Sequence, residues 1–492
     1  MFIVKVFLII LSILFFSSVI LNIVRPYNFY IRIHIIISFL PILASILLLV
    51  FLKNEVIYGP FVFNTLSCLL SVFIYILGFI IQKFSVRYLL GDENYKSYFF
   101  FFTNISIFAS LAWFSKDLRI MVICWGITLL CLLLLIRRNT FWGVTGKVAK
   151  TTFYAFLGSW ISFLLAILLI YIYTHNWTIS LTDFESLPHI VKFLINVLLV
   201  ITVAVPAGQF PFQKWLIETA VTPTPVSAIM HAGIVNAGGV ILSRFSYIFT
   251  NDVSIAILLI MASLTVLIGS GISRVHVDYK RQLIGSTMSQ MGFMLIQCCM
   301  GAYLSAIIHL MLHGIFKATL FLQSGSVLNN ISEPTLKNFK YSYRLIVIGK
   351  GVATIVALVF FINNHFNIYS IIVSVIIYSS ISIAWRQLVA FGVEYLGKIL
   401  GLLTIIITVL TYIFTHEMFI RILYAMHFPM NPPSLFNVIL VAFIFMLGSL
   451  FNIWISLKPQ SPLVCKIYLR LINIGEASER AIDKHPRYLN KY

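Results

Sequence analysis

The sequence QFPFQKWLIETAVTPTPVSAIMHAGIVNAGGVILSR, from Gln209 to Arg244, joins a proline-broken apolar passage to a hydrophobic helix that carries one histidine, His231. A second apolar segment, AIIHLMLHGIFKATLF from Ala306 to Phe321, carries three more ionisable residues: His309, His313 and Lys317. Ionisable side chains in segments apolar enough to enter a bilayer are costly and usually mark ion pathways. The two segments therefore predict ion handling inside a membrane.

The composition is that of a polytopic membrane protein. The chain has 492 residues, of which 60% are hydrophobic and 10% are charged. A bilayer core of about 30 Å needs about 20 apolar residues per helix, and such runs recur along nearly the whole chain. The first run, from Phe2 to Val24, lacks a small-residue cleavage site, so we interpret it as a transmembrane helix and not as a signal peptide. We predict an all-α fold of about fifteen transmembrane helices, starting near residues 2, 31, 61, 97, 118, 151, 188, 225, 254, 283, 303, 343, 368, 399 and 434.

The basic residues predict how the chain crosses the membrane. The formal net charge is +19, but the lysines and arginines are confined mostly to short loops, which is typical of membrane topology and not of nucleic-acid binding. Base-rich loops follow the first, third, fifth, ninth and eleventh predicted helices, and the intervening loops are poor in bases. Since positive residues resist translocation, we predict an N-terminus outside the cell and a C-terminus in the cytoplasm. Membrane lipids and protons or sodium ions are the expected partners, with no nucleic acid.

Motifs for enzyme chemistry are absent from the sequence. We find no phosphate-binding glycine loop, no metal-spaced cysteine and histidine set, no nucleophile elbow and no dinucleotide fingerprint. The six cysteines fall in or beside apolar segments, and we interpret them as small core residues. We therefore expect no enzymatic activity and no cofactor or metal in this chain.

The seventh predicted helix is interrupted by two prolines. Pro206 and Pro211 flank Gly208, and each proline removes a backbone donor and clashes with the preceding turn. Transporters tolerate a broken helix where the freed carbonyls face protein or water. The polar residues that follow favour a functional break, although an ordinary proline kink is the alternative.

The histidine and lysine row in the second segment is the stronger signal. His309, His313 and Lys317 are spaced i, i+4 and i+8, so they line one face of a single helix. Histidine titrates near neutral pH and can pass protons on, so we interpret the row as a proton relay; a structural polar stripe is the alternative. His231, among small residues, would by itself be interpreted as a core histidine.

Further polar residues extend this pattern toward the cytoplasmic end. Lys280 lies at the expected mouth of the tenth helix, next to Arg281, for which topological anchoring is the simpler interpretation. Three polar residues in the same helix could continue a hydrogen-bonded path or bond neighbouring helices: Ser286, Ser289 and Gln290. Lys350 either snorkels to a basic loop or contributes to function. In the tail from Lys458, apolar residues at helical spacing predict an interfacial or frayed helix, with a docking element as the alternative.

These residues carry a family resemblance. The sequence resembles the proton-conducting membrane transporters, which include the large antiporter-like subunit of respiratory NADH:quinone oxidoreductase, the large subunit of multisubunit sodium/proton antiporters and the membrane subunit of DAB-type inorganic carbon transporters. The resemblance rests on five motifs: NTLSCLLS (Asn64–Ser71), YLLGDENYKSYFFFF (Tyr88–Phe102), PTPVSAIMHAG (Pro223–Gly233), DYKRQLIGSTMSQMGFM (Asp278–Met294) and HLMLHGIFKATLFLQSGSV (His309–Val327).

The resemblance implies two inverted five-helix repeats and a central row of polar residues. By motif match, that row comprises His231, Lys280, His309, His313 and Lys317. The implied organisation is N-terminal helices (1–96), a first repeat (97–250), a second repeat (251–396), C-terminal helices (397–457) and a cytoplasmic tail (458–492).

The sequence departs from the respiratory and antiporter members at the first half-channel. Gly126 stands where those members carry a glutamate, and Pro206 stands where they carry the lysine that pairs with it. Phe156 and Ser159 replace an arginine and an aspartate. The first half-channel of the respiratory type is thus expected to be lost.

The sequence is most similar to the DAB-type membrane subunits. That resemblance implies the ion-conducting subunit of a two-component inorganic carbon (CO2 or bicarbonate) uptake system in a bacterial cell membrane. Its partner would be a large cytoplasmic subunit that resembles a carbonic anhydrase and holds zinc. The alternatives are a proton-translocating subunit of NADH:quinone oxidoreductase, a sodium/proton antiporter subunit, or a membrane anchor that has lost conduction.

Overall fold

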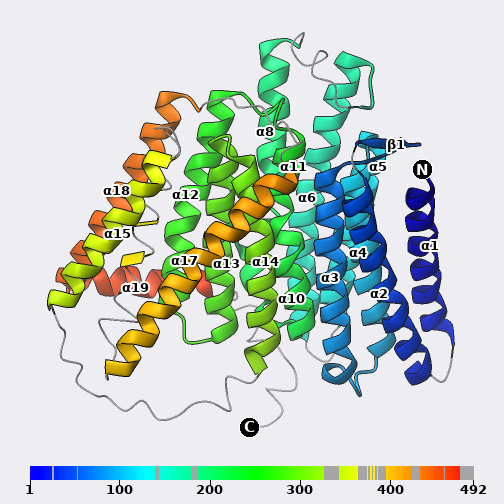
Figure 1. Ribbon diagram of the computed structural model, residues 1–492, viewed down its shortest axis with the longest axis horizontal. Helices are drawn as coiled ribbons and strands as arrows, with labels where there is room; N and C mark the ends of the chain where they lie inside the picture. The colour runs from blue at the N-terminus through cyan, green and yellow to red at the C-terminus, as the bar shows by residue number, and fades with distance from the viewer. Residues whose placement is uncertain are drawn as a thin grey trace. The chain divides into compact units, whose positions relative to one another are not determined.

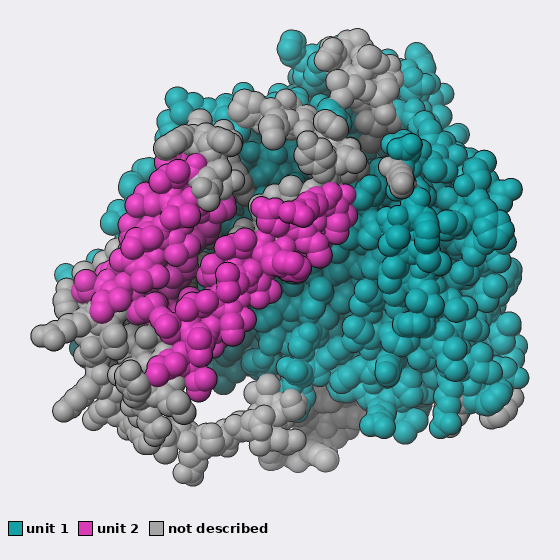
Figure 2. Space-filling model, in the orientation of Figure 1, with its two compact units in different colours: residues 1–327, 425–492 teal, residues 328–424 magenta. Residues whose placement is uncertain are grey.

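The computed structural model describes residues 1–24, 27–52, 54–138, 143–178, 187–325, 343–363, 395–423, 433–458 and 460–476, together with residues 374, 377, 378, 381, 382 and 385. The chain divides into two compact units, which Figure 2 shows in different colours. The first unit comprises residues 1–327 and 425–492, and the second comprises residues 328–424.

The first unit is built from long helices that run alternately up and down (Figure 1). Its N-terminal part contains α1 (Phe2–Ile23), α2 (Tyr27–Phe51), α3 (Thr65–Tyr88), α4 (Tyr95–Phe114), α5 (Leu118–Arg137) and α6 (Gly143–Thr174). The central part contains α8 (His189–Ala204), α9 (Lys214–Glu218), η1 (Thr219–Val221), α10 (Thr224–Ala232), η2 (Ile234–Asn236), α11 (Ala237–Arg244), α12 (Asp252–Val275), α13 (Tyr279–Cys299) and α14 (Tyr303–Gln323). Two C-terminal helices complete it: α18 (Leu435–Leu457) and α19 (Pro462–Gly475). The second unit contains α15 (Tyr343–Asn363) and α17 (Tyr395–Leu423).

Within the described residues, ten helices are long and apolar enough to cross a membrane. The chain is therefore a multi-pass helical membrane protein, as predicted, but the predicted count of fifteen spans is not confirmed. The helix predicted near residue 368 lies outside the described residues. α13 is not among the ten apolar spans, because it carries Lys280, Arg281 and several uncharged polar residues.

A β-hairpin and the starts of two helices differ from the predicted all-α fold and its predicted helix starts. Strands β1 (Val56–Tyr58) and β2 (Phe61–Phe63) form an antiparallel hairpin around Gly59, whose φ of 58° suits a tight turn. Residue 61, the predicted start of the third helix, therefore lies in a strand. α3 begins instead at Thr65, where Asn64 accepts a hydrogen bond from the backbone N–H of Ser67 in a capping box. Whereas α3 begins later in the chain than predicted, α6 begins earlier, at Gly143 and not at residue 151.

Glycine allows α12 and α13 to cross at very short range. A β-carbon at Gly269 would lie 2.6 Å from the carbonyl oxygen of Gly285, and one at Gly285 would lie 2.8 Å from the carbonyl oxygen of Gly269. No larger residue fits at either position without moving a backbone. This crossing fixes α13 against the bundle and thereby fixes the helix that faces α14.

The C-terminal helix α19 runs across the direction of the long helices of the first unit (Figure 1). Its Leu471 packs on Gly271 of α12, where a β-carbon would lie 2.9 Å from the leucine side chain. Lys466 and Arg470 lie on its exposed side. The predicted helix in the tail is thus confirmed up to Gly475, and residues from 477 onward lie outside the described part.

Candidate ion pathway

The three ionisable residues of α14 lie on one face of the helix, as their spacing predicts. The rings of His309 and His313 meet edge to face, with their centroids 5.9 Å apart. Lys317 is only 1% exposed, and its Nζ donates a hydrogen bond of 3.1 Å to the carbonyl oxygen of Leu283 on α13. At 1.5 Å per residue the row extends over about 12 Å of helix. This length is less than half of the apolar core of about 30 Å.

The first member of the row, His309, has a partner that sequence reasoning missed. Its Nδ1 lies 3.0 Å from Oε1 of Gln297, near the end of α13. Because an amide oxygen can only accept, Nδ1 carries the proton in this arrangement and Nε2 presents a lone pair. The ring of Phe293, one turn earlier on α13, packs against the same histidine with centroids 5.8 Å apart.

His231 of α10 joins the α14 row through an aromatic contact. Its ring is fully buried and stacks on Phe321, with centroids 4.5 Å apart and planes 6° apart. Phe321 follows Lys317 by four residues, so both lie on the same face of α14. Two turns before Phe321, Gly314 of α14 approaches the carbonyl oxygen of Ala232, and a β-carbon at position 314 would lie 2.7 Å from that oxygen. The structure thus brings His231, predicted from a different segment, beside the row.

Two histidines of this group have unused ring nitrogens. Both nitrogens of His231 and both nitrogens of His313 are buried and have no hydrogen-bond partner among the described residues. Buried polar groups normally have partners, and leaving one unpaired costs about 1–3 kcal/mol. An ordinary core histidine would be bonded. A neutral imidazole has one N–H and one nitrogen with a lone pair, so each ring can take up one proton at its free nitrogen, or hold water between the members of the row.

Lys280 lies at an open pocket at one end of α13. Its Nζ donates a 2.8 Å hydrogen bond to the carbonyl oxygen of Thr222, and the carboxylate of Asp278 caps the helix by accepting from the backbone N–H of Lys280. The pocket has a volume of ≈ 470 Å³ and is lined by Tyr88, Leu89, Leu90, Asp92, Val221, Thr222, Pro223 and Lys280. An ammonium at the rim of a polar pocket can exchange protons with solvent.

Within the described residues, no hydrogen bond connects the row with the other polar residues predicted for the path. On α13, Ser286 and Ser289 are half-buried and Gln290 is exposed, and none makes a side-chain hydrogen bond within the described residues. Their contribution stays a prediction. Lys350 is exposed on α15 of the second unit.

The predicted break in the seventh helix is present, and its freed carbonyls are accounted for. α8 ends at Ala204, and Pro206 has no N–H to offer the carbonyl oxygen of Thr202; the hydroxyl of Ser159 donates to that oxygen instead, at 2.9 Å. The indole N–H of Trp215 donates to the carbonyl oxygen of Val205 at 2.8 Å. Because backbone polar groups within a membrane must find partners inside the protein, these side chains hold the break as a built feature of the fold.

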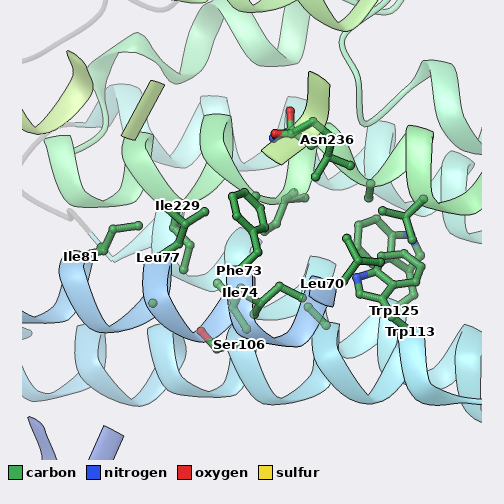
Figure 3. Close-up of a pocket in the computed structure, with 18 residues that line it drawn as sticks. Leu70, Phe73, Ile74, Leu77, Ile81, Ser106, Trp113, Trp125, Ile229 and Asn236 are labelled. Carbon is green, nitrogen blue, oxygen red and sulfur yellow. The ribbon is translucent and has the colours of Figure 1, made fainter. Parts of the chain in front are cut away.

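A second break, which sequence reasoning missed, follows His231. α10 ends at Ala232, a short 3₁₀ turn spans Ile234–Asn236, and α11 continues from Ala237. An apolar cavity of ≈ 60 Å³ lies beside this turn, and Figure 3 shows Phe73 and Leu77 of α3 together with Trp125 around it. Its lining offers almost no polar atoms, so it can hold no bare ion.

Aromatic side chains fill the region where the sequence lacks the first half-channel's charges. The indole of Trp160 occupies the space beside Gly126 and donates to the carbonyl oxygen of Val122 at 3.0 Å. Phe156 packs edge to face on Trp215, with centroids 4.8 Å apart. This region therefore offers an ion no charged group among the residues named here.

Comparison with known proteins places this geometry in a family. Residues 115–368 match the family model described as NADH:quinone oxidoreductase/Mrp antiporter, transmembrane. The chain is 44% identical over 467 residues to the probable inorganic carbon transporter subunit DabB of Bacillus subtilis (strain 168), covering 94% of this chain and 92% of that protein. It is 34% identical over 263 residues to NADH-quinone oxidoreductase subunit L of Buchnera aphidicola subsp. Schizaphis graminum, covering 51% and 42%.

A solved structure has the same fold. A chain of the Mrp complex from Dietzia sp. DQ12-45-1b superposes with a TM-score of 0.63 at 19% identity, covering 95% of this chain and 59% of that chain. At this identity the likeness concerns the fold alone.

Proposed function

The chain belongs to the NADH:quinone oxidoreductase/Mrp antiporter transmembrane family, and from this premise we propose that it is the ion-conducting membrane subunit of a two-component inorganic carbon uptake system. In this role it passes protons or sodium ions down their gradient, and the energy drives the accumulation of CO2 or bicarbonate. The observation that carries the proposal is the 44% identity along nearly the full length of a protein named as a probable inorganic carbon transporter subunit.

The row on α14 supplies the conducting part of this proposal. A proton enters at the pocket beside Lys280, is taken up by the buried amine of Lys317 in its neutral form, and passes from the resulting ammonium along His313 to His309. The free nitrogens of His313 can accept a proton on one side while the ring releases one on the other. His231, stacked on Phe321, adds an acceptor at the Lys317 end of the row. Members that are not in direct hydrogen-bonding contact require water between them.

The filled region around Gly126 favours one conducting row in place of two. With Trp160 and Phe156 packed there, no described charge replaces the glutamate and lysine of the respiratory members. A chain that lacks that pair is poorly suited to the coupled pumping of a respiratory complex, and better suited to passive conduction that energises a partner.

The partner we propose is a large cytoplasmic subunit that resembles a carbonic anhydrase and holds zinc. We propose no enzymatic activity and no cofactor for this chain itself. The described residues contain no group of three or more His, Cys, Asp or Glu side chains placed to hold a metal ion. In this proposal the partner performs the hydration chemistry, and this chain conducts the ion.

We propose that the chain lies in a bacterial cell membrane with its N-terminus outside and its C-terminus cytoplasmic. The pocket beside Lys280 supports this orientation, because residues of the α3–α4 connection, which Arg87 and Lys96 flank, line it together with Lys280. Two base-rich loops therefore lie at the same end of the bundle, where positive residues are retained in the cytoplasm.

The experiment that tests the function is uptake of labelled bicarbonate by cells that express the chain with and without the protein encoded by its neighbouring gene. Uptake that rises only with the pair, and that collapses when the ion gradient is dissipated, supports the proposal. No gain of uptake from the pair would sink it.

The second candidate is a proton-translocating subunit of NADH:quinone oxidoreductase or of a multisubunit sodium/proton antiporter. The match to the Buchnera respiratory subunit favours it, although that match covers only 51% of this chain. Sodium-driven proton exchange in everted vesicles, with no effect on bicarbonate uptake, would select this candidate over the first.

A further inference from the structure

Glu218 is the only acidic residue among those the structure describes whose side chain is buried, at 3% exposure. The row described above consists of histidines and lysines and contains no carboxylate. A single carboxylate buried among packed helices is costly unless it has a counter-charge or binds a cation.

The position of Glu218 links the broken helix to the pocket at Lys280. It is the last residue of α9, the five-residue helix inside the break, and α9 packs against α6 and α13. The 3₁₀ turn Thr219–Val221 follows directly, and the next residue, Thr222, lines the pocket and accepts from Lys280. Glu218 thus lies one short turn of chain away from the pocket.

The charge of Glu218 is only loosely compensated. Its Oε1 lies 3.9 Å from Nζ of Lys214, a separation too long for a hydrogen bond. The lysine side chain is 65% exposed, whereas that of the glutamate is 4% exposed. Within the described part of the chain, no donor forms a hydrogen bond with the carboxylate. The pair therefore leaves room for a second cation to compete for the carboxylate.

The same stretch contains surplus hydrogen-bond acceptors. Three side-chain oxygens there have no partner among the described residues: Gln209 Oε1, Gln213 Oε1 and Thr224 Oγ1. Gln209 is fully buried. Unpaired acceptor oxygens in this stretch are suited to interact with a proton or a hard cation.

We propose that Glu218 is the carboxylate that takes up the transported cation, a proton or a sodium ion, on the pocket side of the pathway. When the cation binds, it neutralises the negative charge of the Glu218 carboxylate, and the Lys214 side chain is free to extend to the surface. When the cation leaves, the carboxylate is negatively charged again and pairs with Lys214. No bond other than that to the cation is made or broken. This inference rests on the proposed conducting function and adds a residue that neither the row nor the family match supplies.

Carbodiimide labelling tests the inference on the unaltered protein. Dicyclohexylcarbodiimide reacts with protonated carboxyl groups in apolar surroundings, so native membranes that contain the chain and its partner should yield an adduct at Glu218, found by peptide mass spectrometry. The adduct should increase as the pH falls. Protection by sodium ions identifies sodium as the bound cation, and labelling that is indifferent to sodium identifies the proton. Absence of an adduct over the pH range in which the chain conducts overturns the inference.

Flux measurements separate this inference from the function on which it rests. In everted vesicles with an imposed ion gradient, Glu218→Gln should lower the flux at least about tenfold at normal membrane abundance. Glu218→Asp should retain part of the flux with a shifted pH dependence, and Glu55→Gln, at an exposed carboxylate, should leave the flux unchanged. If the wild-type chain conducts and the Glu218→Gln variant conducts equally well, this inference alone is overturned. A wild-type chain that conducts neither ion overturns the proposed function and this inference with it.

Discussion

The indole of Trp160 lies against Gly126, in space that a β-carbon at position 126 would have to share with the indole nitrogen. The same nitrogen donates to the carbonyl oxygen of Val122, one turn earlier on α5. The absence of a side chain at position 126 and the presence of the tryptophan on α6 are thus two parts of one packing arrangement.

Replacing Gly126 by Ala should lower the thermal stability of the purified protein, because the added methyl overlaps Trp160. Overpacking of this kind costs about 1–3 kcal/mol. The penalty should shrink when Trp160 is also changed to Phe, which a double-mutant cycle on melting temperatures would measure. Gly158→Ala is the matched control, since nothing lies within 4 Å of a β-carbon there. Equal effects at positions 126 and 158 would contradict the packing account.

Lys317→Met should abolish ion flux and carbon uptake without loss of membrane abundance. Methionine fills most of the space of the lysine but leaves the carbonyl oxygen of Leu283 without this donor and removes the exchangeable proton from the row. Flux in everted vesicles and bicarbonate uptake in cells are the measurements. Thr319→Val, on the exposed face of the same helix, is the control and should conduct normally. Normal uptake by the Lys317 variant would favour a membrane anchor over a conductor.

His231→Phe separates the packing role of this ring from its chemistry. Phenylalanine can keep the parallel stack on Phe321 but has no ring nitrogen. We expect normal abundance and stability, because neither nitrogen has a protein partner to lose within the described residues. The ion flux should fall several-fold if the nitrogens serve the relay. An unchanged flux with unchanged stability would make His231 a core residue.

Sequence patterns predicted those features that depend on a single segment. The face shared by His309, His313 and Lys317 follows from helical spacing, and the end of α8 follows from the missing N–H of Pro206. The break at Gly233 was not predicted, because the sequence of the 3₁₀ turn Ile234–Asn236 contains no proline and is compatible with a continuous helix.

Features that depend on two segments could not be predicted from spacing. Gln297 and His309 lie on different helices, and nothing in the α13 sequence marks that glutamine over Gln290. Likewise, Gly126 indicated a lost glutamate, but not that Trp160 would occupy the space. Glu218 was not singled out from the sequence, because its burial depends on the packing of α9 against α6 and α13.

The pH dependence of stability should contain a contribution from His276, which lies outside the transmembrane helices between α12 and α13. Burial lowers the pKa of His276, and the neighbouring Arg281, whose Nη1 lies 3.3 Å from Nε2, lowers it further; the carboxylates of Asp278 and Glu476 act in the opposite direction. The folded state therefore binds fewer protons than the unfolded state just below the ordinary histidine pKa of about 6.5.

Stability should accordingly fall as the pH drops below about 6.5, and His276→Gln should remove part of this loss. The measurement is the melting temperature of wild type and variant at a series of pH values from about 7.5 to about 5, where the difference between the two isolates His276 from other histidines. A difference in melting temperature between the two proteins that does not change with pH would contradict the contribution assigned to His276.

Ser159 and Pro206 should be energetically coupled although no hydrogen bond joins them. Pro206 deprives the carbonyl oxygen of Thr202 of its helical donor, and the Ser159 hydroxyl supplies one at 2.9 Å. Ser159→Ala should therefore cost about 1–3 kcal/mol, the penalty for an unpaired buried acceptor. In a Pro206→Ala background the alanine N–H can reach the same oxygen, so the Ser159 substitution should cost much less there.

The control is Ser162→Ala, because the hydroxyl of Ser162 donates to the carbonyl oxygen of Gly158 within its own helix. The cost of this substitution should not depend on residue 206. Additive losses for Ser159 and Pro206 would mean that the serine does not replace the missing donor, and that the break is held by other contacts such as that of Trp215.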